Sequence, residues 1–113
     1  MLSGKKYNPE DISQYFGKTF ITESGSRYSI TSKGTITGRE SVENYQVELI
    51  AGLEDQEFSE LRESLCSREI LDLMIRESGK EIKEGLHLAV SLTKDSELTG
   101  LSTGKIISIE DTL

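Results

Sequence analysis

The side chains best suited to nucleophilic catalysis occur once each. Cys66 is the only thiol and His87 the only imidazole in the 113 residues. A nucleophile needs a base within hydrogen-bond reach and a third group that orients this base. The pattern places Cys66 near a helix end, where a packed thiol is ordinary, and His87 on the polar face of a strand. We expect an exposed, unpaired His87, with a catalytic Cys66–His87 pair as the minor alternative, and assign no catalytic residue.

Acidic side chains that lie close together in the sequence raise the question of a divalent cation. Glu54, Asp55 and Glu57 offer the oxygen ligands that Ca²⁺ and Mg²⁺ prefer. Their spacing lacks the alternating pattern of a calcium loop, and acids at these positions also stabilise the start of a helix. One Cys and one His do not supply the usual ligands of zinc. We therefore expect neither a metal nor another cofactor.

Glycines near the C-terminal end have a spacing close to that of a phosphate-binding loop. Gly100 and Gly104 precede Lys105, but the motif has four residues between its glycines and Ser or Thr after its lysine. Here three residues separate the glycines and Ile106 follows the lysine. The segment also leads into a strand, whereas the motif opens a helix. We attribute these glycines to turns, and no dinucleotide-binding fingerprint is present.

Two segments that lie far apart in the sequence are both rich in hydroxyl groups and glycine. They are residues 24–28 and residues 101–106, and each leads into a strand. If the sheet closes so that its first and last strands pair, the two segments meet and form a polar concavity. The candidate binding residues there are Arg27, Tyr28, Thr103 and Lys105. Ordinary turn chemistry is the competing explanation of the same residues.

The first half of the chain predicts a short helix followed by strands. Asn8 as a cap and Pro9 at the first helical position predict a helix over residues 9–16. Residues 1–6 are expected to form a loose terminus. Alternating and β-branched residues then predict four strands, at residues 20–23, 27–31, 35–37 and 45–50. Turns are predicted at residues 24–26 and 32–34, and a loop at residues 38–43.

Residues 54–78 predict two helices. Phe58, Leu61 and Leu65 fall on one face of the first helix. Ser67 and Gly79 are suitable caps of the second helix, although its apolar run over residues 70–75 also fits a buried strand. The expected apolar face of this helix consists of Ile70, Leu71, Met74 and Ser78. Asp72 and Arg76 are spaced for an i, i+4 ion pair.

The last third of the chain predicts further strands. Residues 86–93 alternate strictly between apolar and polar or small side chains, which is typical of a strand. Turn-forming residues predict a long loop over residues 94–104, followed by a strand at residues 105–110. Leu73, Ile75 and Ile106 lie off the main apolar faces, so a structure with its oligomeric state would show whether they are buried within one chain or between chains.

This order of elements predicts an α+β, β-rich fold. Strands that follow one another without intervening helices pair antiparallel. We expect a curved or closed antiparallel sheet of five to seven strands, with a short N-terminal helix and a central two-helix segment. Residues 1–113 are expected to form a single domain in which residues 54–78 are a helical insertion between two strand blocks.

Charge and composition restrict the partners. The net charge is −7, and all of this excess lies in residues 53–113, whereas residues 1–52 are balanced. An acidic surface repels phosphate backbones and anionic lipids, so we expect no nucleic-acid and no membrane partner. The chain shows no apolar leader after Met1, no segment long enough to span a bilayer and only one cysteine, which indicates a soluble, cytoplasmic protein.

Three functions are compatible with these observations. The favoured hypothesis is a non-enzymatic protein-interaction or assembly module that binds a protein partner or a second copy of itself, because no catalytic constellation is assembled. The first alternative is a small-ligand-binding domain that uses the mouth of a closed sheet or a helix–sheet cleft. The second alternative is an enzyme that uses carboxylates.

Overall fold

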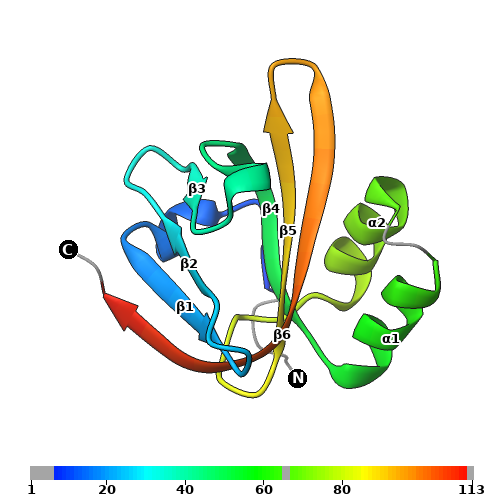
Figure 1. Ribbon diagram of the computed structural model, residues 1–113. Coiled ribbons are helices and arrows are strands. Elements are labelled where there is room, and N and C mark those ends of the chain that lie inside the picture. The colour runs from blue at the N-terminus through cyan, green and yellow to red at the C-terminus, as the bar shows by residue number, and fades with distance from the viewer. Residues whose placement is uncertain (1–6, 65–66, 112–113) are drawn as a thin grey trace, which may run out of the picture.

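The computed structural model describes residues 7–64 and 67–111. The helical elements are the 3-10 helices η1 (Ile12–Tyr15) and η2 (Glu40–Val42) and the α-helices α1 (Asp55–Glu63) and α2 (Arg68–Ser78). The strands are β1 (Lys18–Thr22), β2 (Arg27–Ile30), β3 (Ile36–Thr37), β4 (Gln46–Leu53), β5 (His87–Lys94) and β6 (Glu97–Asp111). The α+β, β-rich expectation is confirmed. Figure 1 shows the two α-helices side by side on one side of the strands.

The six strands form one curled antiparallel sheet in the order β3-β2-β1-β6-β5-β4. Its two outer strands approach each other, because the amide of Ile36 donates to the carbonyl of Tyr45 at 3.0 Å and the amide of Val47 to that of Gly34 at 2.9 Å. β6 is long enough to pair with β5 along its first part and with β1 along its last part. β6 therefore joins the strands that precede the helices (β1, β2 and β3) to β5 and β4 in one sheet.

The predicted helix over residues 9–16 is only a single 3-10 turn, η1. The segment from Pro9 to Gly17 is so short that its few α-helical hydrogen bonds would not offset the free-energy cost of helix nucleation. Gly17 ends the segment in the left-handed region at φ 79°. Its apolar residues nevertheless pack against the core, with Ile12 and Phe16 partly buried beside it. Tyr15 is buried, and its hydroxyl accepts a hydrogen bond from the amide of Ile82 at 3.0 Å.

The predicted loop over residues 94–104 is wrong. Asp95 and Ser96 alone make the turn, with Asp95 at φ 56°, and β6 begins at Glu97. The Thr, Ser and Gly residues that suggested a loop instead pair with β5, as in the register of Leu92 with Thr99. Pairing with a neighbouring strand decides the conformation of such residues more than their own propensity.

Helices α1 and α2 confirm the two-helix segment, and residues 70–75 are helical. The predicted face of α2 needs correction, because Leu71 and Ile75 are buried while Ile70 is 38 % exposed. The stripe that faces the sheet also holds Arg68 and Asp72, so a pattern of apolar residues alone places it wrongly. Asp72 pairs with Arg68 at 2.9 Å rather than with Arg76.

The sheet has apolar cores on both of its faces. One core lies inside the curl and includes Phe20, Tyr28 and Val90. The other lies between the helices and the outer face of β4 and β5, and includes Leu61 and Ala89. β5 is therefore buried on both sides over its first six residues, although its sequence alternates. The alternation in β5 is typical of a strand with one face in water, but here the helices cover that face.

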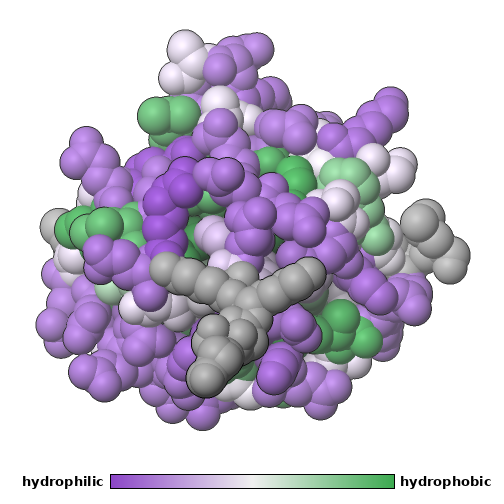
Figure 2. All heavy atoms as spheres, turned by 180° about the vertical axis from the view of Figure 1, so that it is seen from behind, coloured by the Kyte–Doolittle hydropathy of each residue, from purple (hydrophilic) through white to green (hydrophobic). Residues whose placement is uncertain are grey.

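The surface and the off-face residues give little support for a large apolar interface. Ile75 and Ile106 are buried within the chain, and Leu73 is 55 % exposed. On the face in Figure 2 most coloured side chains are hydrophilic, and the hydrophobic ones form small separate patches. Within the described ranges, no helix combines the length and the apolar character needed to cross a bilayer.

Candidate functional site

A hollow of about 330 Å³ lies between α1, the β1–β2 turn and the middle of β6. We call it the arginine–hydroxyl pocket. Its lining residues are Thr22, Ser24, Ser26, Tyr28, Arg39, Phe58, Arg62, Ser102, Thr103 and Gly104. The two hydroxyl-rich segments that the sequence singled out therefore meet, and the amide of Glu23 donates to the carbonyl of Lys105 at 2.8 Å where they do.

Irregular pairing of β6 explains why three consecutive residues line the pocket. His87 pairs with Lys105 but Ala89 pairs with Ser102, so the register shifts within this stretch of β6. The register with β1 also shifts, beside Thr22. Side chains of a regular strand alternate between its faces, and a bulge turns an extra residue toward one side. The pocket thus forms where β6 leaves one neighbour for the other.

Hydroxyl groups form the wall on the side of the β1–β2 turn. The hydroxyls of Thr22 and Ser24 lie 3.0 Å apart, and those of Ser24 and Ser26 lie 3.3 Å apart. Gly25 allows this tight turn because it adopts φ 89°. A hydroxyl both donates and accepts, so the chain of hydroxyls can reorient its hydrogen atoms toward a ligand of either kind.

Helix α1 supplies another wall through Phe58 and Arg62. These two residues are four positions apart and so share a face of the helix, and Asp55, three positions before Phe58, lies on the same stripe but does not line the pocket. The guanidinium of Arg62 lies over the ring of Phe58, 5.7 Å from its centroid. This places a donor-only, always charged group at the rim of the pocket.

A second arginine reaches the pocket from the segment before η2. The guanidinium of Arg39 lies over the ring of Tyr28, 5.7 Å from its centroid. In the described part of the chain, neither Arg39 nor Arg62 forms an ion pair with a carboxylate. Among the described residues each cation thus contacts an aromatic ring and no carboxylate, in a chain with an excess of acids.

The predicted binding residues divide into two pairs. Tyr28 and Thr103 line the pocket. Arg27 does not line it and pairs with Glu110 at 3.1 Å, and Lys105 pairs with Asp55 at 3.3 Å. Their position next to a pocket residue in the sequence is what placed them among the candidates, but side chains of neighbouring strand residues point to opposite faces.

Arg39 and Arg62 are the residues that the sequence-based prediction missed. A signal for Arg62 was present, since no acid stands three or four residues from it in an acid-rich helix. Arg68, by comparison, has Asp72 four residues later. No local signal marks Arg39, which reaches the pocket only through the fold.

The ring of His87 lies directly beside the pocket and is only 6 % exposed. The expectation of an exposed, unpaired histidine is therefore wrong, because α1 covers this end of β5. Its Nδ1 lies 2.9 Å from the carbonyl oxygen of Thr103, and its Nε2 lies 2.8 Å from Oδ1 of Asp55. Hydrogen bonds from His87 and then from Lys105 lower the pKa of Asp55 below its ordinary value of 3.8.

These contacts restrict the chemistry of the neighbouring groups. Both ring nitrogens of His87 have partners, so neither is available as a base toward the pocket. Cys66, the proposed partner of His87, lies outside the described residues. Of the acids considered as cation ligands, Glu57 caps the amide of Glu54 at 3.0 Å and Glu54 pairs with Lys80. Within the described residues no group of three or more potential metal ligands gathers.

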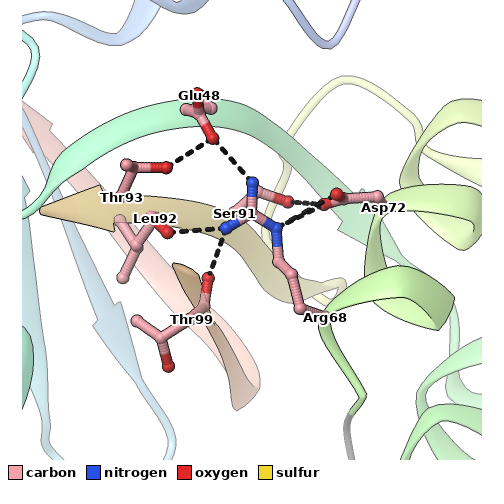
Figure 3. A network of polar contacts seen from close by, with 7 residues as sticks. All are labelled: Glu48, Arg68, Asp72, Ser91, Leu92, Thr93 and Thr99. Carbon is pink, nitrogen blue, oxygen red and sulfur yellow. Dashed lines mark hydrogen bonds and ion pairs between the residues drawn. The ribbon is translucent and has the colours of Figure 1, made fainter. Parts of the chain in front are cut away.

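A separate polar network attaches α2 to the sheet (Figure 3). The guanidinium of Arg68 donates to Asp72, to Glu48 at 2.7 Å and to the carbonyls of Leu92 at 2.6 Å and Thr99 at 3.1 Å. Arg68 is 16 % exposed at its side chain, and its donors point at protein acceptors from three strands and one helix. This arginine therefore has a structural role, in contrast to Arg39 and Arg62.

No family model, curated protein or solved structure matches this chain.

Proposed function

We propose that the protein is a non-enzymatic ligand-binding domain and that its arginine–hydroxyl pocket binds an oxyanion such as a phosphate group. The observation that carries the proposal is the pairing of Arg39 and Arg62 across one hollow without a carboxylate partner among the described residues. Two guanidinium groups repel each other, and an anion between them removes this repulsion. Arginine also matches the geometry of phosphate and carboxylate oxygens, because its donors form a planar fork.

The neighbouring groups support this proposal. The hydroxyl-bearing residues Thr22, Ser24 and Ser26 line the same pocket and carry no negative charge that would repel an anion. Cation–π contact with Phe58 and Tyr28 holds the two guanidinium groups without neutralising them. Pre-ordering the cations reduces the side-chain entropy that ligand binding would otherwise cost.

The other two hypotheses have less support. An enzyme that uses carboxylates would need a carboxylate in the pocket, and none is among its lining residues within the described chain. A protein-interaction or assembly module remains a prediction. Leu73 is exposed on α2, and Leu98 and Ile107 are exposed toward opposite ends of β6. The hydrophobic side chains on the face in Figure 2 form small separate patches.

The test is titration with inorganic phosphate at low ionic strength, followed by calorimetry and by amide chemical shifts. Removing either guanidinium in Arg39→Gln or Arg62→Gln should weaken binding about tenfold or more, because a hydrogen bond to a charged group contributes about 1.5–3 kcal/mol. Shifted amides should include those of Arg39, Arg62 and Ser102, which line the pocket. A bound anion should also raise the thermal midpoint by mass action.

The matched control is Arg27→Gln, which removes an arginine that lies outside the pocket lining and pairs with Glu110. This variant changes the net charge by the same amount and should keep the phosphate affinity within about twofold, as expected of a screened surface charge. Equal weakening by all three substitutions would mean that only the general field of the protein attracts the anion. The proposal would then be wrong.

A further inference from the structure

The size of the arginine–hydroxyl pocket bears on what the oxyanion is attached to. A hollow of about 330 Å³ lies at the small end of the range for small-molecule sites, about 300–1,000 Å³. A free phosphate ion, with five heavy atoms, would occupy only part of it. The rest of the hollow would stay hydrated or hold the remainder of a ligand.

The wall chemistry indicates the nature of that remainder. Besides the two arginines and two aromatic residues, the pocket is lined by Thr22, Ser24 and Ser26 from the β1–β2 hairpin and by Ser102, Thr103 and Gly104 from β6. The ring of Phe58 is stacked against His87, and Tyr28 as a whole residue is only 2 % exposed. An apolar or flat aromatic ligand group would therefore lose its contact with water without gaining a broad apolar surface.

The lining groups also differ in whether they donate or accept hydrogen bonds. Arg39 and Arg62 only donate, so they suit an oxygen that carries charge. The linked hydroxyls of Thr22, Ser24 and Ser26 donate and accept, so they suit a ligand hydroxyl, which does both. The pocket thus combines an oxyanion end with a hydroxyl end.

Building on the proposed function, we propose that the ligand class is a small hydroxylated organic phosphate, such as a sugar phosphate. The phosphate group lies between Arg39 and Arg62, and the hydroxylated part lies against the β1–β2 turn at Ser24 and Ser26. The pocket therefore discriminates by the hydroxyl groups of the ligand as well as by its charge.

The experiment compares four probes by calorimetry: inorganic phosphate, glucose 6-phosphate, phenyl phosphate and a phosphoserine tripeptide. Glucose 6-phosphate should bind about tenfold more tightly than inorganic phosphate, because two additional hydrogen bonds of ordinary strength correspond to about that factor. Phenyl phosphate and the tripeptide should bind no more tightly than inorganic phosphate.

The double variant Ser24→Ala, Ser26→Ala separates the two parts of the pocket. Both positions lie on the surface turn, so the fold should tolerate the change. The advantage of glucose 6-phosphate should disappear, whereas the affinity for inorganic phosphate should stay within about twofold. Ser96→Ala removes a hydroxyl from the β5–β6 turn outside the pocket and should leave all affinities unchanged.

The results distinguish this inference from the proposed function. If all phosphates bind equally and depend on Arg39 and Arg62, the oxyanion site stands and the ligand class is wrong. The ligand class is also wrong if phenyl phosphate or the tripeptide binds more tightly than glucose 6-phosphate. It is equally wrong if the preference for glucose 6-phosphate persists in the double variant. If none of the four probes binds, both proposals are wrong.

Discussion

The rings of His87 and Phe58 are stacked, with centroids 3.8 Å apart and planes 7° apart. Phe58 contacts this buried histidine and also the guanidinium of Arg62, which belongs to the same helix, α1. His87 in turn is bonded to Asp55 in the first turn of α1 and to the backbone of β6. The stack therefore fixes the position of α1 on the sheet and, with it, one wall of the arginine–hydroxyl pocket.

Replacing the histidine in His87→Ala should destabilise the fold. The change removes a buried ring, leaves the carbonyl of Thr103 without its donor and opens a cavity under Phe58. We expect a loss of about 2–4 kcal/mol in the free energy of unfolding, measured by urea denaturation. Phosphate binding should weaken too, because Arg62 loses its support. Leu98→Ala, at an exposed site on β6, should change stability by less than about 0.5 kcal/mol. A similar small effect at His87 would show that the stack does not hold α1.

The acid sensitivity of the protein should depend on Asp55. Its pKa is lowered in the folded state, so the folded protein binds the proton less readily than the unfolded chain. The contribution of Asp55 is therefore present above its ordinary pKa of 3.8 and is lost as pH falls through the lower folded value. Asp55→Asn should flatten the decline of unfolding free energy between about pH 5 and about pH 2.

Glu48 provides the comparison for this pH experiment. Hydrogen bonds from Thr93 and then from Arg68 lower its pKa below the ordinary 4.5, so it adds a second acid-sensitive contribution elsewhere in the fold. Glu48→Gln should remove that contribution but leave the part that depends on Asp55. Identical pH profiles of wild type and Asp55→Asn would contradict the assigned role of the His87 and Lys105 contacts.

Two arginines of α2 should differ widely in their contribution to stability. Arg68→Ala leaves the carbonyls of Leu92 and Thr99 and the carboxylate of Asp72 without their donor, and should cost about 3 kcal/mol. Arg76→Ala removes an exposed arginine that makes one ion pair with Glu10, and should cost less than about 1 kcal/mol. Urea denaturation of both variants tests the difference, and equal losses would show that the network in Figure 3 adds nothing beyond a surface pair.

Removing an acid at the edge of the pocket should strengthen oxyanion binding. The side chain of Glu23 lies beside Gly104, since a β-carbon built there would stand 3.2 Å from its Oε1. Glu23→Gln should raise phosphate affinity about twofold at low salt and have less effect as salt increases. Glu110→Gln, which removes an acid paired with Arg27 outside the pocket lining, is the matched control. An unchanged affinity in Glu23→Gln would place the bound anion away from this edge.

Local patterns predicted most of the elements. The structure has turns where the sequence predicted them, at the Ser-Gly-Ser segment and at Gly34. Helix α2 is capped at the predicted residues, Ser67 and Gly79. The errors are of another kind. Residues 97–104 have turn-forming side chains but form a strand, because a neighbouring strand supplies partners for their backbone groups.

The sequence predicted where the candidate site lies but not the arginines that line it. The meeting of the β1–β2 turn with β6 followed from the expected pairing of first and last strands. Tyr28 and Thr103 were placed in the concavity for that reason. Arg27 and Lys105 do not line the pocket, because of the bulge in β6 and the alternation of side chains along the strands. A single sequence shows neither the bulge nor the face to which each side chain points.

The sequence by itself determined the class of fold, the two-helix segment and the hydroxyl-rich turn, because these depend on periodicity, caps and glycine over a few neighbouring residues. Only the tertiary structure decided that His87 is buried and that Arg39 and Arg62 face one hollow. Those outcomes depend on α1 covering the end of β5 and on β6 changing neighbours. Such contacts join residues that are dozens of positions apart, and their geometry depends on packing that no local pattern encodes.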